Sequence, residues 1–267
     1  MAVDFLFKDK YNINDLIEIV RILRAPGGCP WDIKQTHASI KKDFIEETYE
    51  VVEAINKDDK TLLCEELGDV LLQVAFHADI ERENGTFDFD DVADGICKKL
   101  IIRHPHVFGD VKADTADEVL TNWDEIKRRT KHQKSVAESI DSIPRELPAL
   151  MRAAKIQSRA AKTGFDFDST DGAFDKITEE TAELREAIAS GDKAKISDEL
   201  GDLLFAAVNV ARFTGVEAEE SLTASSDKFA SRFKITEELA KQRNIDMKSA
   251  SIEELDVLWD EAKKLTK

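Results

Sequence analysis

Proline and glycine are scarce in this chain, with five prolines and 11 glycines among 267 residues. Both residues mark turns and interrupt helices, so their scarcity disfavours a fold built from many short segments joined by tight turns. Leucine, alanine, glutamate and lysine are abundant instead, and all four favour helix. We therefore predict an all-α protein.

Cysteines are few, and long apolar runs are missing. Cys29, Cys64 and Cys97 form no C-x-x-C pair, which excludes a typical zinc site and a disulfide framework. No stretch approaches 18 consecutive apolar residues, and the first residues lack a basic segment followed by an apolar one. We expect a cytoplasmic protein with reduced thiols, without a signal peptide or a membrane span.

Positive charge is also in short supply. The chain has 38 lysines and arginines against 55 acidic residues, a formal net charge of −17. This balance argues against a non-specific nucleic-acid binder, because phosphate backbones are bound by basic surfaces. An acidic protein can still bind a small polyphosphate when metal ions offset the repulsion.

What the chain does have is a duplication. EETYEVVEAINKDDKTLLCEELGD at residues 46–69 recurs as EETAELREAIASGDKAKISDELGD at residues 179–202. Five acidic positions keep the same register, namely Glu46/Glu179, Glu47/Glu180, Glu50/Glu183, Glu66/Glu199 and Asp69/Asp202. The repeat and the length predict two domains, at residues 1–133 and 149–267, joined by a polar linker at 134–148 that contains two prolines.

The conserved spacing places carboxylates on one face of each helix. Glu47 and Glu50 are three residues apart, as are Glu66 and Asp69 on the next predicted helix. A short turn between the helices makes them antiparallel neighbours, so the two faces meet around one point. Each ELGD segment directly precedes an apolar run, which argues against a merely solvated face. Oxygen-only ligands of this kind suit Mg²⁺ or Mn²⁺.

Three other site types fail on the sequence. Di-iron bundles need Glu-x-x-His, and no histidine of this chain has an acidic residue three positions earlier. An apparent calcium loop beginning at Asp166 has Asp171 where glycine is needed and Ile177 where glutamate is needed. Gly27-Gly28 is not followed by the GK[ST] of a phosphate-binding loop.

Basic and aromatic residues recur downstream of the acidic segments. Lys-x-x-x-Arg occurs at Lys99/Arg103 and Lys228/Arg232, and Trp-x-x-x-Lys at Trp123/Lys127 and Trp259/Lys263. Lysine and arginine one helical turn apart can bind two phosphate groups. A tryptophan one turn before a lysine offers a stacking surface for a base beside a phosphate contact. These pairs predict nucleotide contacts.

In combination these motifs identify a family. EExxE followed after fifteen residues by ExxD, together with GGCPWD at residues 27–32 and RHPHVF at 103–108, resembles the MazG family of nucleoside triphosphate pyrophosphohydrolases. The resemblance covers nearly the whole chain and is closest to the tandem-repeat bacterial members. It implies an all-α fold, a four-helix-bundle assembly completed by homodimerisation, Mg²⁺ dependence, and cleavage of nucleoside triphosphates to nucleoside monophosphate and pyrophosphate in nucleotide-pool housecleaning.

The resemblance also assigns roles to residues. It implies Mg²⁺ ligands at Glu47, Glu50, Glu66 and Asp69 in the first repeat, and at Glu180, Glu183, Glu199 and Asp202 in the second. Glu46 and Glu179 are catalytic candidates that orient or deprotonate the attacking water. The triphosphate and base are held by Lys228, Arg232, Trp259 and Lys263, and by Lys99, Arg103, Trp123 and Lys127.

Two questions stay open on the sequence. Arg152, Lys155, Arg159 and Lys162 precede the second acidic helix, whereas the first is preceded by fewer basic residues, so the second repeat is expected to be the more active. The alternatives to a general pyrophosphohydrolase are a dUTP/dCTP- or modified-nucleotide-selective pyrophosphatase, a non-catalytic Mg²⁺–nucleotide sensor, and a purely structural helical-repeat protein.

Overall fold

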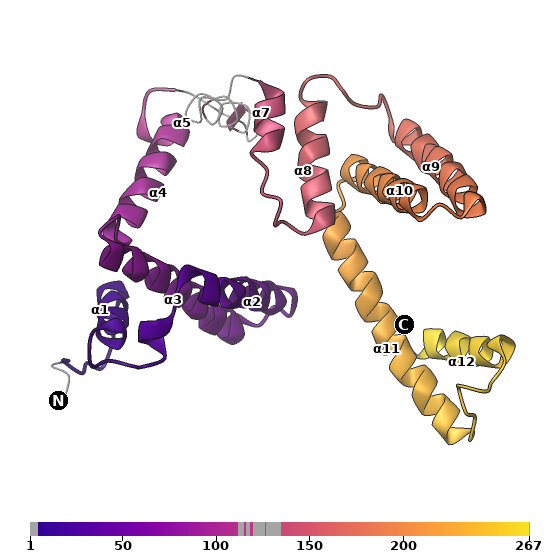
Figure 1. Cartoon of the computed structure of the whole chain (residues 1–267), viewed down its shortest axis with the longest axis horizontal. Coiled ribbons are helices and arrows are strands. Elements are labelled where there is room, and N and C mark those ends of the chain that lie inside the picture. Colours follow the sequence, from indigo (N-terminus) through magenta and orange to yellow (C-terminus); the bar gives the residue numbers. More distant parts are fainter. Residues whose placement is uncertain (1–4, 112–114, 116–117, 120–125, 127–134, 267) are drawn as a thin grey trace. The chain divides into compact units, whose positions relative to one another are not determined.

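The computed structural model describes residues 5–111, 115, 118–119, 126 and 135–266. Throughout these residues the regular elements are helices, which confirms the predicted all-α fold. The chain forms two compact units that divide between Lys127 and Arg128 (Figure 1). The domain limits at 133 and 149 and the linker between them stay predictions.

The first unit is organised around one long helix. Its elements are α1 (Ile13–Arg24), the 3₁₀ turn η1 (Asp32–Lys34), α2 (His37–Asn56), α3 (Lys60–Asn84), α4 (Phe89–Arg103) and α5 (Pro105–Phe108). Helix α3 contacts α1, α2 and α4. Val20, Ile40 and Phe76 form the centre of its apolar core. The sequence also predicts a short helix over residues 118–129, which falls almost wholly outside the described residues.

The second unit repeats this plan and adds to it. Its elements are α7 (Val136–Asp141), α8 (Ala149–Ala161), α9 (Thr170–Ser190), α10 (Lys193–Thr214), α11 (Ala218–Gln242) and α12 (Ile252–Leu265). Helix α10 contacts α8, α9 and α11, and α11 contacts α12 around Leu239 and Leu258. Helix α7 lies within the expected linker and packs on α8.

The helix starts follow the same repeat register as the carboxylates. Thr36 caps α2 and Ser169 caps α9, while Asp59 caps α3 and Asp192 caps α10. In both pairs the second residue follows the first by the 133 positions that separate Glu46 from Glu179. A cap side chain satisfies free amide groups of the first turn and so defines where a helix begins. The acidic residues therefore occupy equivalent turns in the two helix pairs.

A buried arginine of α1 links this helix to α3 and to the η1 turn. Arg24 is 5% exposed, and its guanidinium lies 3.3 Å from the Asp79 carboxylate and 2.7 Å from that of Glu83. It also donates to the main-chain carbonyl of Asp32. The chain turns sharply after α1 at Gly28, where a Cβ atom would lie 2.4 Å from two carbonyl oxygens, so only glycine fits.

None of the described helices is long and apolar enough to cross a membrane.

Candidate metal and nucleotide site

Carboxylates from α2 and α3 meet in the first unit. Oxygen atoms of Glu47, Glu66 and Asp69 all lie within 4.8 Å of one another. Glu66 is 9% exposed, and the other two are half-buried. Glu50 adjoins this group, since its carboxylate interacts with those of Glu47 and Glu66. All four ligands that the resemblance implies for this repeat are thus close together.

The second unit builds the corresponding cluster from α9 and α10. Glu180 belongs to two groups whose oxygens come within 4.8 Å, one with Glu179 and Glu183 and one with Glu199 and Asp202. Glu180 is only 4% exposed. Its Oε2 is buried and has no hydrogen-bond partner, while Oε1 lies 2.5 Å from the Lys176 ammonium. A buried carboxylate oxygen without a partner is costly, and a bound cation removes that cost.

Burial and mutual repulsion perturb these carboxyl groups. Burial raises the pKa of Glu66, as do the neighbouring charges of Glu50 and Asp69. The pKa of Glu47 is raised for the same reasons, burial first. In the second unit burial, together with Glu180 and Glu199, raises the pKa of Glu183. Like charges held together in this way are typical of a site that binds a cation.

The donor set selects a class of metal. Both clusters offer carboxylate oxygens from two antiparallel helices, and no histidine or cysteine belongs to the groups found among the described residues. Hard oxygen ligands favour Mg²⁺ and Mn²⁺ over the metals that prefer nitrogen or sulfur. The residues present therefore fit the metal that the sequence predicts.

The remaining predicted residues are placed less uniformly. Glu179 is exposed and lies 2.9 Å from Lys176, and Glu46 is exposed on α2. Lys228 and Arg232 lie on α11, and Trp259 and Lys263 lie on α12.

Three of these residues contact α11, α12 or the residue that follows α12. The Arg232 Nε donates to the Thr266 hydroxyl, the Trp259 ring packs at 5.1 Å from Phe229, and Lys263 pairs with Asp260. Lys99 and Arg103 lie on α4, while Trp123 and Lys127 lie outside the described residues. The structure thus brings the carboxylates together, whereas Arg232, Trp259 and Lys263 contact residues of the C-terminal helix pair and of the turn that follows it.

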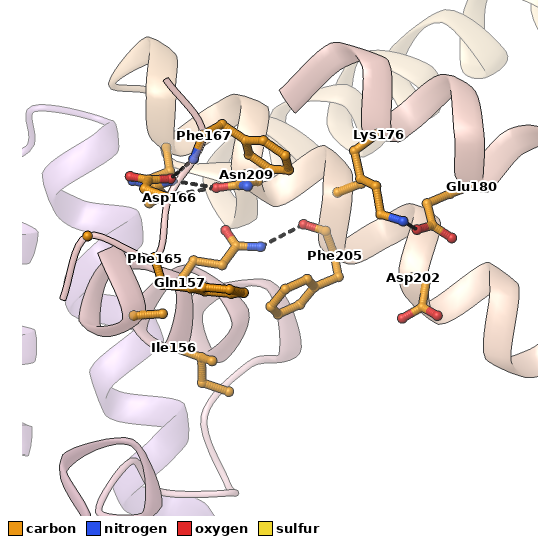
Figure 2. Close-up of a pocket in the computed structure, with 14 residues that line it drawn as sticks. Ile156, Gln157, Phe165, Asp166, Phe167, Lys176, Glu180, Asp202, Phe205 and Asn209 are labelled. Carbon is orange, nitrogen blue, oxygen red and sulfur yellow. Dashed lines mark hydrogen bonds and ion pairs between the residues drawn. The ribbon is translucent and has the colours of Figure 1, made fainter. Parts of the chain in front are cut away.

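A pocket of about 540 Å³ opens beside the second cluster. Figure 2 shows Lys176, Glu180 and Asp202 at one side of it and the Phe165, Phe167 and Phe205 rings at the other. Its residues come from α8, the α8–α9 loop, α9 and α10. Such a mainly apolar cavity with a few polar groups is typical of a small-molecule site.

Sequence reasoning missed the polar groups of this pocket. Lys176 had a usable signal, because it precedes Glu180 by four residues and so shares its helix face. The first repeat has Asp43 at the matching position. Gln157 and Asn209 gave no signal, since each is a single amide that does not recur at the matching position of the first repeat.

Known proteins with similar sequences include nucleoside triphosphate pyrophosphohydrolases. The family model for the MazG nucleotide pyrophosphohydrolase domain matches residues 35–108 and 169–236. A nucleoside triphosphate pyrophosphohydrolase of Escherichia coli strain K12 is 44% identical over 257 residues, which cover 94% of this chain and 97% of the relative. The nucleoside triphosphate pyrophosphohydrolase/pyrophosphatase MazG of Thermotoga maritima is 44% identical over 249 residues, covering 93% and 94%.

A Bacillus subtilis protein, the uncharacterized YabN, is 48% identical over 248 residues, which cover 92% of this chain but 50% of YabN. Each of the two family matches contains one complete EExxE and ExxD set, at residues 46–69 and 179–202.

Proposed function

Because the chain belongs to the MazG nucleotide pyrophosphohydrolase family, we propose that it hydrolyses nucleoside triphosphates to nucleoside monophosphate and pyrophosphate. The observation that carries the proposal is the double cluster of carboxylates, each with oxygens within 4.8 Å, at the two matched segments. A helical protein without a catalytic or binding role has no need to bury such mutually repelling groups twice.

We propose Mg²⁺ as the metal, with Mn²⁺ as a possible substitute. Glu47, Glu50, Glu66 and Asp69 would hold it in the first unit, and Glu180, Glu183, Glu199 and Asp202 in the second. When bound, Mg²⁺ neutralises phosphate oxygens, lowers the pKa of water and stabilises the departing charge. The unpartnered Glu180 Oε2 supports this assignment, because it is an acceptor that the protein itself leaves unsatisfied.

The proposed reaction is an in-line displacement at the α-phosphorus. A water oxygen forms a bond to this phosphorus, and the bond to the oxygen that bridges to the β-phosphate breaks. Pyrophosphate leaves with the electron pair, and the water proton passes to a base. Glu179 or Glu46 is the candidate for this base, since each is exposed and adjoins a ligand glutamate in sequence.

Phosphate and base contacts complete the proposal. Lys228, Arg232, Trp259 and Lys263 are assigned to the second site, and Lys99, Arg103, Trp123 and Lys127 to the first. In the second unit Lys176 adds a cation beside the carboxylates, 2.5 Å from Glu180 and 2.9 Å from Glu179. Because the first unit has Asp43 at that position, we propose that the second repeat is the more active.

A homodimer is proposed from the apolar residues that α9 and α10 expose. Phe174, Ile188, Leu200 and Leu204 are each between 47% and 57% exposed on this helix pair. Two such helix pairs packed together would form a four-helix bundle and remove these side chains from water. The cytoplasmic location and the reduced cysteines stay predictions from the sequence.

Hydrolysis in H₂¹⁸O tests the point of attack. If water attacks the α-phosphorus, the label enters the nucleoside monophosphate and the pyrophosphate stays unlabelled. Label in pyrophosphate instead would place the attack at the β-phosphorus and refute the proposed chemistry. Metal-dependent nucleotide binding with no product from any natural, deoxy or modified nucleotide would support the sensor function.

A further inference from the structure

One buried acceptor in the second unit has no partner. The Gln157 side chain on α8 is 6% exposed, and its Nε2 donates to the main-chain carbonyl of Phe205 at 2.7 Å. A carbonyl oxygen can only accept, so the amide orientation is fixed by this bond. The Oε1 atom is consequently turned away from Phe205 (Figure 2), and it is buried without a hydrogen bond.

Asn209 on α10 lines the same pocket and has the complementary orientation. Arg212 donates to Asn209 Oδ1 twice, from Nε at 3.0 Å and from Nη2 at 2.7 Å. Arg212 in turn forms an ion pair with the carboxylate of Asp166, which lies in the middle of the α8–α9 loop. Because the two arginine bonds occupy the amide oxygen, the Asn209 nitrogen is left to act as a donor.

The pocket therefore combines one oriented acceptor and one oriented donor with aromatic walls. Phe165, Phe167 and Phe205 supply rings against which a flat group can stack. A planar ligand with a donor and an acceptor on one edge matches this set. Nucleobases present such an edge, and leaving a buried acceptor unpaired costs free energy that the right ligand recovers.

The position of the pocket agrees with the proposed chemistry. The same cavity is lined by Glu180 and Asp202, which belong to the proposed metal cluster. In a nucleoside triphosphate only the ribose separates the α-phosphate from the base. A site that cleaves at the α-phosphorus must therefore accommodate the base in a cavity that adjoins the metal ligands, as this one does.

We propose that Gln157 and Asn209 read the hydrogen-bonding edge of the substrate base, so that the second repeat selects nucleotides whose edge is unblocked. This inference rests on the proposed function and names specificity-determining residues for it. The substrate class is a nucleoside triphosphate whose base carries a free N–H donor beside an acceptor.

The first repeat is built differently at the matching positions. Arg24 precedes Gln157 by 133 residues, and Phe76 precedes Asn209 by the same number. Arg24 and Asp79 form a buried ion pair at 3.3 Å. Arginine in place of Gln157 removes the acceptor, and phenylalanine in place of Asn209 removes the donor, so base reading is expected in the second repeat alone.

The test compares nucleotides that differ by one edge group. UTP is paired with N3-methyl-UTP, and ATP with purine riboside triphosphate, which lacks the 6-amino group. For the wild type we expect kcat/KM to fall about 10- to 100-fold for each modified nucleotide, as the loss of one buried hydrogen bond predicts. The Gln157→Leu variant should cleave the natural nucleotides less well and lose the discrimination within each pair.

Two variants complete the design. Gln73→Leu removes a second buried glutamine oxygen without a partner, this one on α3, and should leave the discrimination intact. Asn209→Asp keeps the acceptor for Arg212 but removes the donor, so it should reduce kcat/KM for the natural nucleotides. Equal cleavage within each pair by the wild type, or discrimination that depends on Gln73 or Trp259 instead of Gln157, overturns the inference.

The outcome for the proposed function is read separately. Pyrophosphate release from UTP or ATP by the wild type tests the reaction, whatever the pairs show. If no nucleotide is cleaved, the proposed function fails, and titration calorimetry of the same pairs with Ca²⁺ then decides the pocket. Weaker binding of the modified nucleotides, abolished in Gln157→Leu, supports base reading; equal binding refutes it.

Discussion

Glu180 is the residue on which the second cluster converges. It is almost fully buried, shares one oxygen with Lys176 and keeps the other unpaired. Its neighbours Glu183 and Asp202 are exposed. Glu180 therefore lies at the border between the buried interior of the unit and the exposed side of the cluster, where a nucleotide would bind. A cation beside it would satisfy both the unpaired oxygen and the surrounding charge.

Lys176 competes with that cation for Glu180. Replacing Lys176 by Met removes a positive charge 2.5 Å from Glu180 and should tighten Mg²⁺ binding to the nucleotide-free protein several-fold. Titration calorimetry measures this affinity. Lys241→Met, which removes an ion pair with Glu237 on α11, is the matched control and should have no effect. Weaker Mg²⁺ binding in Lys176→Met would show that the lysine supports the metal site instead of competing with the metal.

Glu66 is expected to lower the stability of the metal-free protein while it serves as a metal ligand. Its pKa is raised in the folded protein, so ionised Glu66 destabilises the metal-free fold above that pKa. The cost disappears as the pH falls through the raised pKa toward the ordinary value of 4.5, where the group is protonated in both states.

Glu66→Gln should therefore raise the melting temperature of the metal-free protein at pH 7.5 by a few degrees, and this gain should shrink near pH 5. Mg²⁺ raises the melting temperature of the wild type by binding to the folded state, and this rise should be smaller in Glu66→Gln. Thermal unfolding with and without EDTA measures both. A lower melting temperature for the metal-free variant at pH 7.5 would contradict this account.

Residues that act through local periodicity could be predicted from the sequence, and those that act through tertiary packing could not. Glu47 and Glu50 share a face in any helix, and their repetition at Glu180 and Glu183 separated them from ordinary surface charge. Gln157 and Asn209 line the same pocket only because α8 and the following loop pack on α10. No spacing along the chain encodes that arrangement.

At the scale of helices, the residues that cap the helix starts recur with the same 133-residue spacing as the carboxylates. Asp192 accepts a hydrogen bond from the amide of Ala194, and Asp59 binds the first turn of α3 in the same way. These caps determine the turn on which Glu199 and Glu66 lie. The helix pair is therefore the duplicated unit, and its loop sequence is free to diverge as long as the cap stays.

Removing a cap should disturb both stability and metal binding. Asp192→Ala is expected to lower the free energy of unfolding by about 1 kcal/mol, because amide groups of the first turn lose their acceptor. It should also weaken Mg²⁺ binding about two- to three-fold, because the first turn of α10, which precedes Glu199, becomes less ordered without its cap. Urea denaturation and calorimetry measure the two effects. Asp192→Asn retains the cap and should behave as the wild type; if it does not, the charge of Asp192 matters instead of the cap.

Helix limits were predicted well where caps and glycines mark them. The sequence pattern predicts a helix over residues 171–190, and α9 is found at Thr170–Ser190, followed by Gly191 in the left-handed conformation. Helix α7 was not expected, because it is a single short segment of six residues within a polar stretch. Its apolar neighbour Ile143 is 2% exposed, so packing on the second unit accounts for a helix that its own sequence predicts weakly.

At the scale of the whole molecule, each unit leaves apolar side chains exposed on its acidic helix pair. In the second unit Leu200 and Leu204 lie one turn apart on α10, on the side of the helix away from Asp202, and are 47% and 48% exposed. A partner that covers them would hold the α9–α10 pair, and with it the carboxylate cluster, in place. Dimerisation and activity are therefore expected to fail together.

Leu204→Glu tests this link. The wild type should sediment at twice the chain mass of 30.0 kDa, and the variant should sediment as a monomer with strongly reduced activity. Analytical ultracentrifugation and pyrophosphate release give the two readouts. Ile252→Glu, which changes a residue 66% exposed at the start of α12, is the control for a surface charge. A dimeric and fully active Leu204→Glu variant would place the interface elsewhere.

Release of pyrophosphate from a mixed panel of ribo- and deoxynucleoside triphosphates with Mg²⁺ tests the central claim most directly. It should be measured on the wild type, on Glu50→Ala and on Glu183→Ala. We predict nucleoside monophosphate and pyrophosphate from the wild type, little change in Glu50→Ala, and a loss of at least about 100-fold in Glu183→Ala, as removal of a metal ligand implies. Undiminished turnover when both glutamates are replaced together would contradict the account.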